Sequence, residues 1–106
     1  MEYSELGTSK LKISKICLGT MTFGETTSEE DGHYQLDDSV ASGINFIDTA
    51  EMYPTCPLRP ETTGDTEIIV GNWISKNKSK RSSIVLATKV SGKGYMEVRN
   101  GEGINA

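Results

Sequence analysis

The feature that most constrains the fold of this sequence is the alternation of short apolar runs with helix-like patterns of apolar residues. Apolar runs of strand length lie at residues 16–20, 45–49 and 84–90. Helical patterns occupy residues 28–42 and 66–77, between those runs. Strands that alternate with helices are typical of βαβ units, in which a helix connects two parallel strands. The sequence therefore predicts an α/β protein with a parallel sheet.

Residues 3–15 precede this pattern and predict a separate small element. The apolar residues Tyr3, Leu11 and Ile13 flank a turn at residues 6–9, so we expect a short β-hairpin. It is too small to be a domain, and we interpret it as a lid or plug.

Local signals mark the helix ends. Thr27 or Ser28 caps the first helix, whose first turn carries acidic residues that the helix dipole favours, and Gly43 ends it. Gly32 weakens this helix by about 1 kcal/mol relative to alanine. Most of its apolar contacts are expected from Tyr34, Leu36, Val40 and Ala41. The apolar face of the second helix is expected to comprise Ile69, Val70, Trp73 and Ile74.

The number of predicted strands bears on domain organisation. Parallel strands are apolar on both sides, so their sheet must be covered on both faces or closed into a barrel. Three strands and two helices achieve neither, and Asn105 would suit the N-cap of a further helix. We therefore interpret the chain as the N-terminal piece of a larger α/β protein. A complete small α/β domain is the alternative.

Composition excludes several classes of partner. The net charge is −4, so the chain lacks the basic surface of a nucleic-acid or membrane-surface binder. The chain has neither a signal sequence nor an apolar segment long enough to span a membrane, and we expect a cytoplasmic protein. Cys17 and Cys56 are not part of a CxxC motif. In a reducing compartment we expect two free thiols, with one disulfide as the alternative, and we predict no metal site.

Each predicted strand ends in residues that are suited to chemistry. The first ends in Gly19 and Thr20, the second in Asp48, and the third in Lys89. Ligands and catalytic groups gather at the carboxyl ends of parallel strands. We therefore expect Asp48 and Lys89 at the same edge of the sheet, where adjacent strands would let them pair.

Tyr53 follows Asp48 closely and completes a candidate proton-donating group. A tyrosine ordinarily has a pKa near 10, too high for efficient acid–base chemistry at neutral pH, and a neighbouring lysine cation favours the phenolate. Asp48, Tyr53 and Lys89 would together form a tunable proton donor. The alternative is that Asp48 and Lys89 are solvated strand ends and that Tyr53 only packs.

These residues lie in stretches that resemble the aldo-keto reductases, NADPH-dependent carbonyl reductases built on a (β/α)8 TIM barrel. The similar stretches are residues 6–7, 11–14, 16–24, 43–53 and 85–90, and the form NFIDTAEMYP is most similar to the bacterial Tas subgroup. The resemblance implies that residues 1–106 are a partial NADP-dependent oxidoreductase domain. This part would comprise the β-hairpin and about three β/α units, truncated after the third barrel strand.

The resemblance also implies a reaction, the reduction of a small aldehyde or ketone by the parent protein with NADPH. Tyr53 would be the proton donor, Lys89 would tune it, and Asp48 would hold Lys89. The residues implied to contact the cofactor near its nicotinamide and ribose are Gly19, Thr20, Met21 and Asp48.

Two features of the family's site are not matched within this sequence, namely a histidine that ends the fourth strand and the contacts to the 2′-phosphate. His33 lies in the first predicted helix and is expected to be a surface or packing residue. We therefore expect the 106-residue chain alone to be inactive and poorly folded. The alternative function is a non-catalytic, cofactor-sensing or interaction piece of the same fold.

Overall fold

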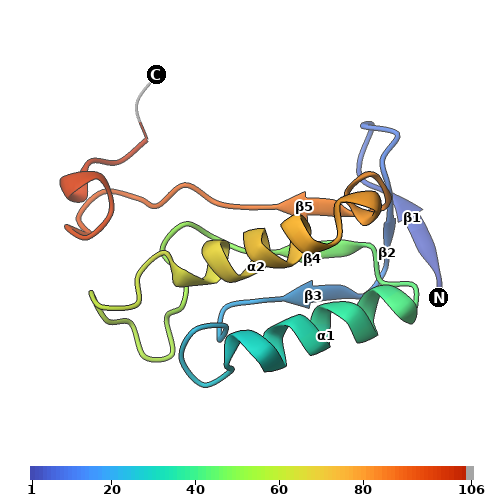
Figure 1. The fold of residues 1–106 in the computed structure, drawn as a ribbon. Coiled ribbons are helices and arrows are strands. Elements are labelled where there is room, and N and C mark those ends of the chain that lie inside the picture. The colour runs from blue at the N-terminus through green and yellow to red at the C-terminus, as the bar shows by residue number, and fades with distance from the viewer. Residues whose placement is uncertain (105–106) are drawn as a thin grey trace.

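A computed structural model describes residues 1–104 (Figure 1). The strands are β1 (Tyr3–Glu5), β2 (Lys12–Ser14), β3 (Cys17–Gly19), β4 (Phe46–Asp48) and β5 (Val85–Ala87). The α-helices are α1 (Glu29–Ala41) and α2 (Asp65–Lys76), and the 3-10 turns are η1 (Lys78–Ser83) and η2 (Arg99–Gly101). The proposed helix cap at Asn105 lies outside the described residues.

The central sheet is parallel, as predicted, with the strand order β3-β4-β5. In its register Gly19 lies beside Asp48, and Asp48 lies beside Ala87. Helices α1 and α2 cover the same face of the sheet (Figure 1). This arrangement leaves the other face, with Cys17 and Gly19, exposed.

The core lies between this sheet and the two helices. Ile47 of β4 is fully buried, and Leu18 and Leu86 of the flanking strands pack against the same cluster. The buried apolar residues of the cluster are Phe23, Leu36, Ile47, Ile69, Val70, Trp73 and Ile84. The predicted apolar face of α2 is confirmed, since its members belong to this cluster or pack against it.

The prediction for the apolar face of α1 was wrong at two positions. Leu36 is buried and Val40 packs on the core, but Tyr34 is 70% exposed and Ala41 is also exposed. Successive helical residues are rotated by about 100°. Tyr34 is therefore on nearly the opposite side of α1 from Leu36, and the buried stripe is narrower than the pattern suggested.

The start of α1 explains why a glycine occurs inside this helix. Ser28 is the N-cap, and its side chain accepts a 3.1 Å hydrogen bond from the backbone N–H of Asp31. Gly32 is buried, and a Cβ atom at this position would lie 2.9 Å from the ring of Phe23. The Phe23 ring therefore lies so close that position 32 requires glycine. This packing offsets the low helix propensity of glycine.

The predicted hairpin, β1 with β2, is antiparallel and closes the end of the sheet from which the strands begin (Figure 1). Asn45, just before β4, anchors it by accepting a 2.7 Å hydrogen bond from the Ser14 N–H and donating one of 2.9 Å to the Lys12 carbonyl. The hydroxyl of Tyr3 donates to the Gly43 carbonyl at 2.7 Å. The hairpin is therefore a plug at the end remote from the carboxyl ends of the strands.

Within residues 1–104, no helix combines the length and apolar character needed to cross a membrane. The same residues hold no cluster of three or more His, Cys, Asp or Glu residues suited to a metal ion. Cys17 and Cys56 are both free thiols and both exposed.

Candidate active site

The carboxyl ends of the three parallel strands bring Asp48 and Lys89 together. The Lys89 ammonium donates hydrogen bonds of 2.7 Å to the Asp48 carboxylate and of 2.7 Å to the Thr49 carbonyl. The sheet positions this pair, because Asp48 ends β4 and the Thr49 N–H donates to the Ala87 carbonyl, at the end of β5, at 2.9 Å. Both side chains remain partly exposed, so solvent reaches the pair.

Tyr53 lies directly beside this ion pair. The Lys89 ammonium is 4.8 Å from the centroid of the Tyr53 ring, within the range of a cation–π contact. The backbone holds Tyr53 at this position, because its N–H donates to the Ala50 carbonyl at 3.2 Å and its carbonyl accepts from the Gly64 N–H at 3.0 Å. The first bond closes a tight turn after β4, and the second ties Tyr53 to the start of α2.

The charge of Lys89 is supported by its neighbours. Burial by itself lowers the pKa of Lys89, but the interactions with Asp48 and then with Tyr53 outweigh it and raise the pKa above the ordinary lysine value. Lys89 is therefore a cation at neutral pH. A fixed positive charge beside a phenol favours the phenolate relative to the neutral form.

The residues expected to contact the cofactor also lie at this edge of the sheet. Thr20 is buried, and its hydroxyl donates a 2.9 Å hydrogen bond to the Asp48 carbonyl. Gly19 is exposed, and a Cβ atom there would meet nothing within 4 Å. Met21 is 39% exposed. Thr20 therefore joins β3 to β4, whereas Gly19 and Met21 border open space beside Asp48.

His33 lies away from this edge, between the two helices. Its Nε2 atom is 2.9 Å from the Ile69 carbonyl, and the same atom is 3.9 Å from a Glu29 carboxylate oxygen. The side chain is largely buried. His33 is thus a packing residue between α1 and α2, as predicted.

Sequence analysis missed the role of Glu51, which joins the loop after β4 to the segment after β5. The Glu51 carboxylate accepts a 2.7 Å hydrogen bond from the Ser91 N–H and forms an ion pair with Arg99. Its pKa is lowered, chiefly by the Ser91 hydrogen bond and then by Arg99. The charged residue between Asp48 and Tyr53 was visible in the sequence, but its partners lie 40 and 48 residues further along.

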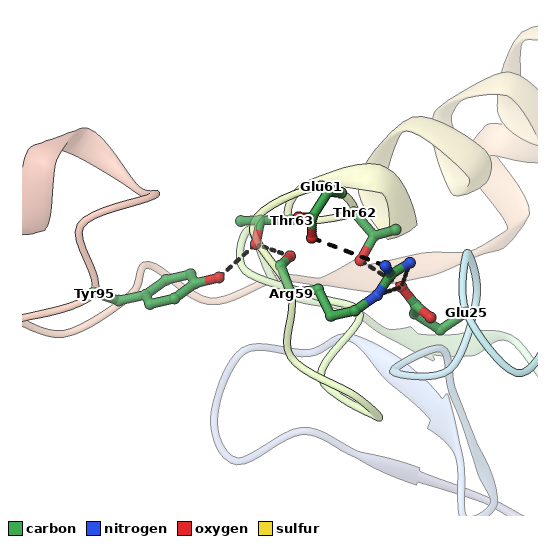
Figure 2. A network of polar contacts seen from close by, with 6 residues as sticks. All are labelled: Glu25, Arg59, Glu61, Thr62, Thr63 and Tyr95. Atoms are coloured by element: carbon green, nitrogen blue, oxygen red, sulfur yellow. Dashed lines mark hydrogen bonds and ion pairs between the residues drawn. The ribbon is translucent and has the colours of Figure 1, made fainter.

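A second polar network that the sequence did not indicate lies at the same end of the sheet, and Figure 2 shows how it joins three loops. Glu25, in the loop after β3, accepts hydrogen bonds of 2.8 Å from Arg59 and 2.7 Å from Thr62, both in the loop after β4. Thr63 is hydrogen-bonded at 2.6 Å to the hydroxyl of Tyr95, which follows β5. These contacts fix the long proline-containing loop that begins beside Tyr53.

A parallel β/α sheet with Tyr53, Lys89 and Asp48 at the carboxyl ends of its strands is the arrangement expected for part of a β/α-barrel protein. Comparison with known families agrees, because the model of the aldo/keto reductase family matches residues 15–104. The chain belongs to the aldo/keto reductase family.

Individual relatives support the same assignment. Over 92 residues the chain is 56% identical to Protein tas of Escherichia coli, a match that covers 87% of this chain and 26% of that protein. It is 41% identical over 90 residues to the uncharacterized oxidoreductase YrpG of Bacillus subtilis, covering 85% of this chain and 26% of that protein. The chain thus spans about a quarter of the length of these curated relatives.

The fold is also similar to solved structures. The holo form of aldo-keto reductase AKR11C1 from Bacillus halodurans matches 97% of this chain and 30% of its own, with a TM-score of 0.71 and 31% identity. The chain is therefore an α/β fragment that corresponds to the N-terminal part of the aldo-keto reductase TIM barrel.

Proposed function

We propose that the protein containing this chain reduces a small aldehyde or ketone with NADPH, and that Tyr53 donates the proton. The observation that carries this proposal is the position of the Lys89 ammonium, 2.7 Å from the Asp48 carboxylate and 4.8 Å from the centroid of the Tyr53 ring. We further propose that residues 1–106 are the part of the oxidoreductase domain that ends after its third barrel strand.

The arrangement suits proton donation to a carbonyl oxygen. As the carbonyl is reduced, negative charge develops on its oxygen, and a hydroxyl within reach can neutralise this charge by giving up its proton. The phenolate that Tyr53 would then become is stabilised by the Lys89 cation. Asp48, in turn, holds Lys89 in position and supports its charge.

The residues present fit one end of the cofactor. When bound, NADPH would supply a hydride. Gly19 has no side chain to fill the space above β3, and the Asp48 carboxylate is 35% exposed beside it. A carboxylate accepts hydrogen bonds from sugar hydroxyls, so Asp48 suits the ribose. Gly19 and Met21 would border the nicotinamide, and the buried Thr20 would support them through its hydrogen bond to the Asp48 carbonyl.

The experiment that tests this proposal uses the full-length protein and follows NADPH consumption with a panel of small aldehydes and ketones. Tyr53→Phe is expected to lower kcat by at least about 10²-fold, because the proton donor is lost, while NADPH binding stays nearly unchanged. Tyr34→Phe is the matched control, because Tyr34 is 70% exposed on α1 and its hydroxyl is remote from the site.

Two results would argue against the proposal. Full activity in Tyr53→Phe would exclude Tyr53 as the donor. NADPH binding by the wild-type protein without turnover of any carbonyl compound would instead favour a cofactor-sensing role.

A further inference from the structure

The segment that carries Lys89 has little packing of its own. Strand β5 ends at Ala87, and Thr88, Lys89 and Val90 are all exposed, Val90 by 55%. The ion pair of Lys89 with Asp48 is partly exposed, and exposed ion pairs contribute little energy. Contacts of the backbone after Lys89 therefore add to the hydrogen bonds that its side chain makes with Asp48 and the Thr49 carbonyl.

Glu51 supplies these backbone contacts from both sides of Val90. Its N–H donates to the Lys89 carbonyl at 3.2 Å, and its carboxylate accepts from the Ser91 N–H at 2.7 Å. One residue, two positions before Tyr53, thus holds the chain directly after Lys89. The donor tyrosine and the lysine are connected through a single short segment.

Arg99 completes this clamp. Its guanidinium pairs with the Glu51 carboxylate and also donates to the Ser91 carbonyl at 3.0 Å. Ser91 is buried, and both of its backbone polar groups are satisfied by this charged pair. The pKa of Glu51 is lowered, first by the Ser91 hydrogen bond and then by Arg99, so the carboxylate stays ionised to a lower pH than an ordinary glutamate does.

We propose that Glu51 is a positioning residue that holds Lys89 beside Tyr53, with Arg99 as its partner. The inference rests on the function proposed above. Glu51 acts through Lys89 and has no contact with the reacting atoms in this role. Without the carboxylate, the segment after Lys89 loses its anchor, and the ammonium spends less time beside the phenol.

The test uses Glu51→Ala in the full-length protein, with Glu30→Gln, an exposed carboxylate on α1, as the control for loss of charge. Misplacing a catalytic group by about 1 Å can cost about 10²-fold in rate, so kcat is expected to fall about 10- to 100-fold with little change in KM. A merely structural role would lower the amount of folded, active protein and leave kcat per active site unchanged.

Two further variants keep the test decisive if Glu51→Ala is insoluble. Glu51→Gln keeps an oxygen that can accept from Ser91, so it should retain more activity than Glu51→Ala. Arg99→Gln should also lower kcat. A variant of Glu51 that folds and keeps the kcat of the wild type would overturn the inference.

Hydrogen exchange separates this inference from the proposed function. The Ser91 amide should exchange faster in Glu51→Ala than in Glu30→Gln, whether or not the protein reduces a carbonyl compound. Unchanged exchange at Ser91 would overturn the clamp. A wild-type protein without reductase activity would instead contradict the proposed function and leave the exchange result interpretable.

Discussion

Lys89 and Asp48 are joined by a 2.7 Å hydrogen bond across the carboxyl end of the sheet, although they lie 41 residues apart in the sequence. The strand order β3-β4-β5 makes this contact possible, because Asp48 ends the middle strand and Lys89 follows its neighbour. The Tyr53 ring lies against the same ammonium group. The pair thus links the sheet to the loop that carries the proposed proton donor.

Removing the Lys89 charge is expected to lower carbonyl reduction by at least about 10²-fold in Lys89→Met, because the phenolate of Tyr53 loses its counter-ion. Steady-state kinetics of the full-length protein measure this. Lys93→Met, an exposed lysine in the following loop, serves as the control. Equal activity of the two variants would contradict the role of Lys89.

The raised pKa of Lys89 also makes its contribution to the free energy of unfolding depend on pH. This contribution is present at neutral pH and is lost only as pH rises above about 10.4.

Adding one methyl group at Gly32 is expected to destabilise the protein. A Cβ atom would lie 2.9 Å from the Phe23 ring, which is fully buried, and overpacking of this kind costs about 1–3 kcal/mol. This cost exceeds the gain of about 1 kcal/mol in helix propensity. Urea denaturation of the full-length Gly32→Ala variant gives the free energy of unfolding.

The matched control is Gly71→Ala in α2, where a Cβ atom would meet nothing within 4 Å among the described residues. This change should be neutral or stabilising by up to about 1 kcal/mol. If Gly32→Ala were as stable as Gly71→Ala, the close approach of Phe23 would not explain the glycine.

The Glu25 carboxylate is expected to titrate below the ordinary glutamate value of about 4.3. Its pKa is lowered first by the hydrogen bond from Thr62 and then by that from Arg59. Because this pKa is lowered, the network stabilises the folded protein at pH values above the ordinary glutamate pKa. This stabilisation is lost as the pH falls through the lowered pKa of Glu25. An NMR titration of the Glu25 side chain measures the midpoint. Thr62→Val should raise this midpoint, whereas Thr26→Val, an exposed threonine beside Glu25, should leave it unchanged.

The order of elements could be predicted from the sequence because local patterns decide it. The cap of α1 at Thr27 or Ser28, the end of this helix before Gly43 and the apolar face of α2 around Trp73 all follow from short-range chemistry. The structure selects Ser28 as the cap. The parallel sheet followed from the alternation of strands and helices. The candidate site followed in part, because Asp48 ends β4 and Lys89 follows the end of β5 by two residues, and the carboxyl ends of parallel strands meet at one edge.

Other features could not be predicted, because they depend on how distant segments meet. Nothing near Gly32 indicates the Phe23 ring that excludes a side chain there. The exposure of Tyr34 depends on which stripe of α1 the sheet covers. Likewise, the partners of Glu51 become apparent only when the loops after β4 and β5 lie side by side.

The sequence by itself determined the helices, the strands, their parallel arrangement and the aldo/keto reductase pattern, because hydrophobic periodicity, caps and motif residues act over a few positions. Only the tertiary structure decided that Glu51 holds the segment after Lys89 through Ser91 and Arg99. It also decided that Glu25 and Arg59, 34 residues apart, join two loops. Such polar contacts depend on geometry to within a few tenths of an ångström, which is set by packing of the whole sheet and its helices and not by local sequence.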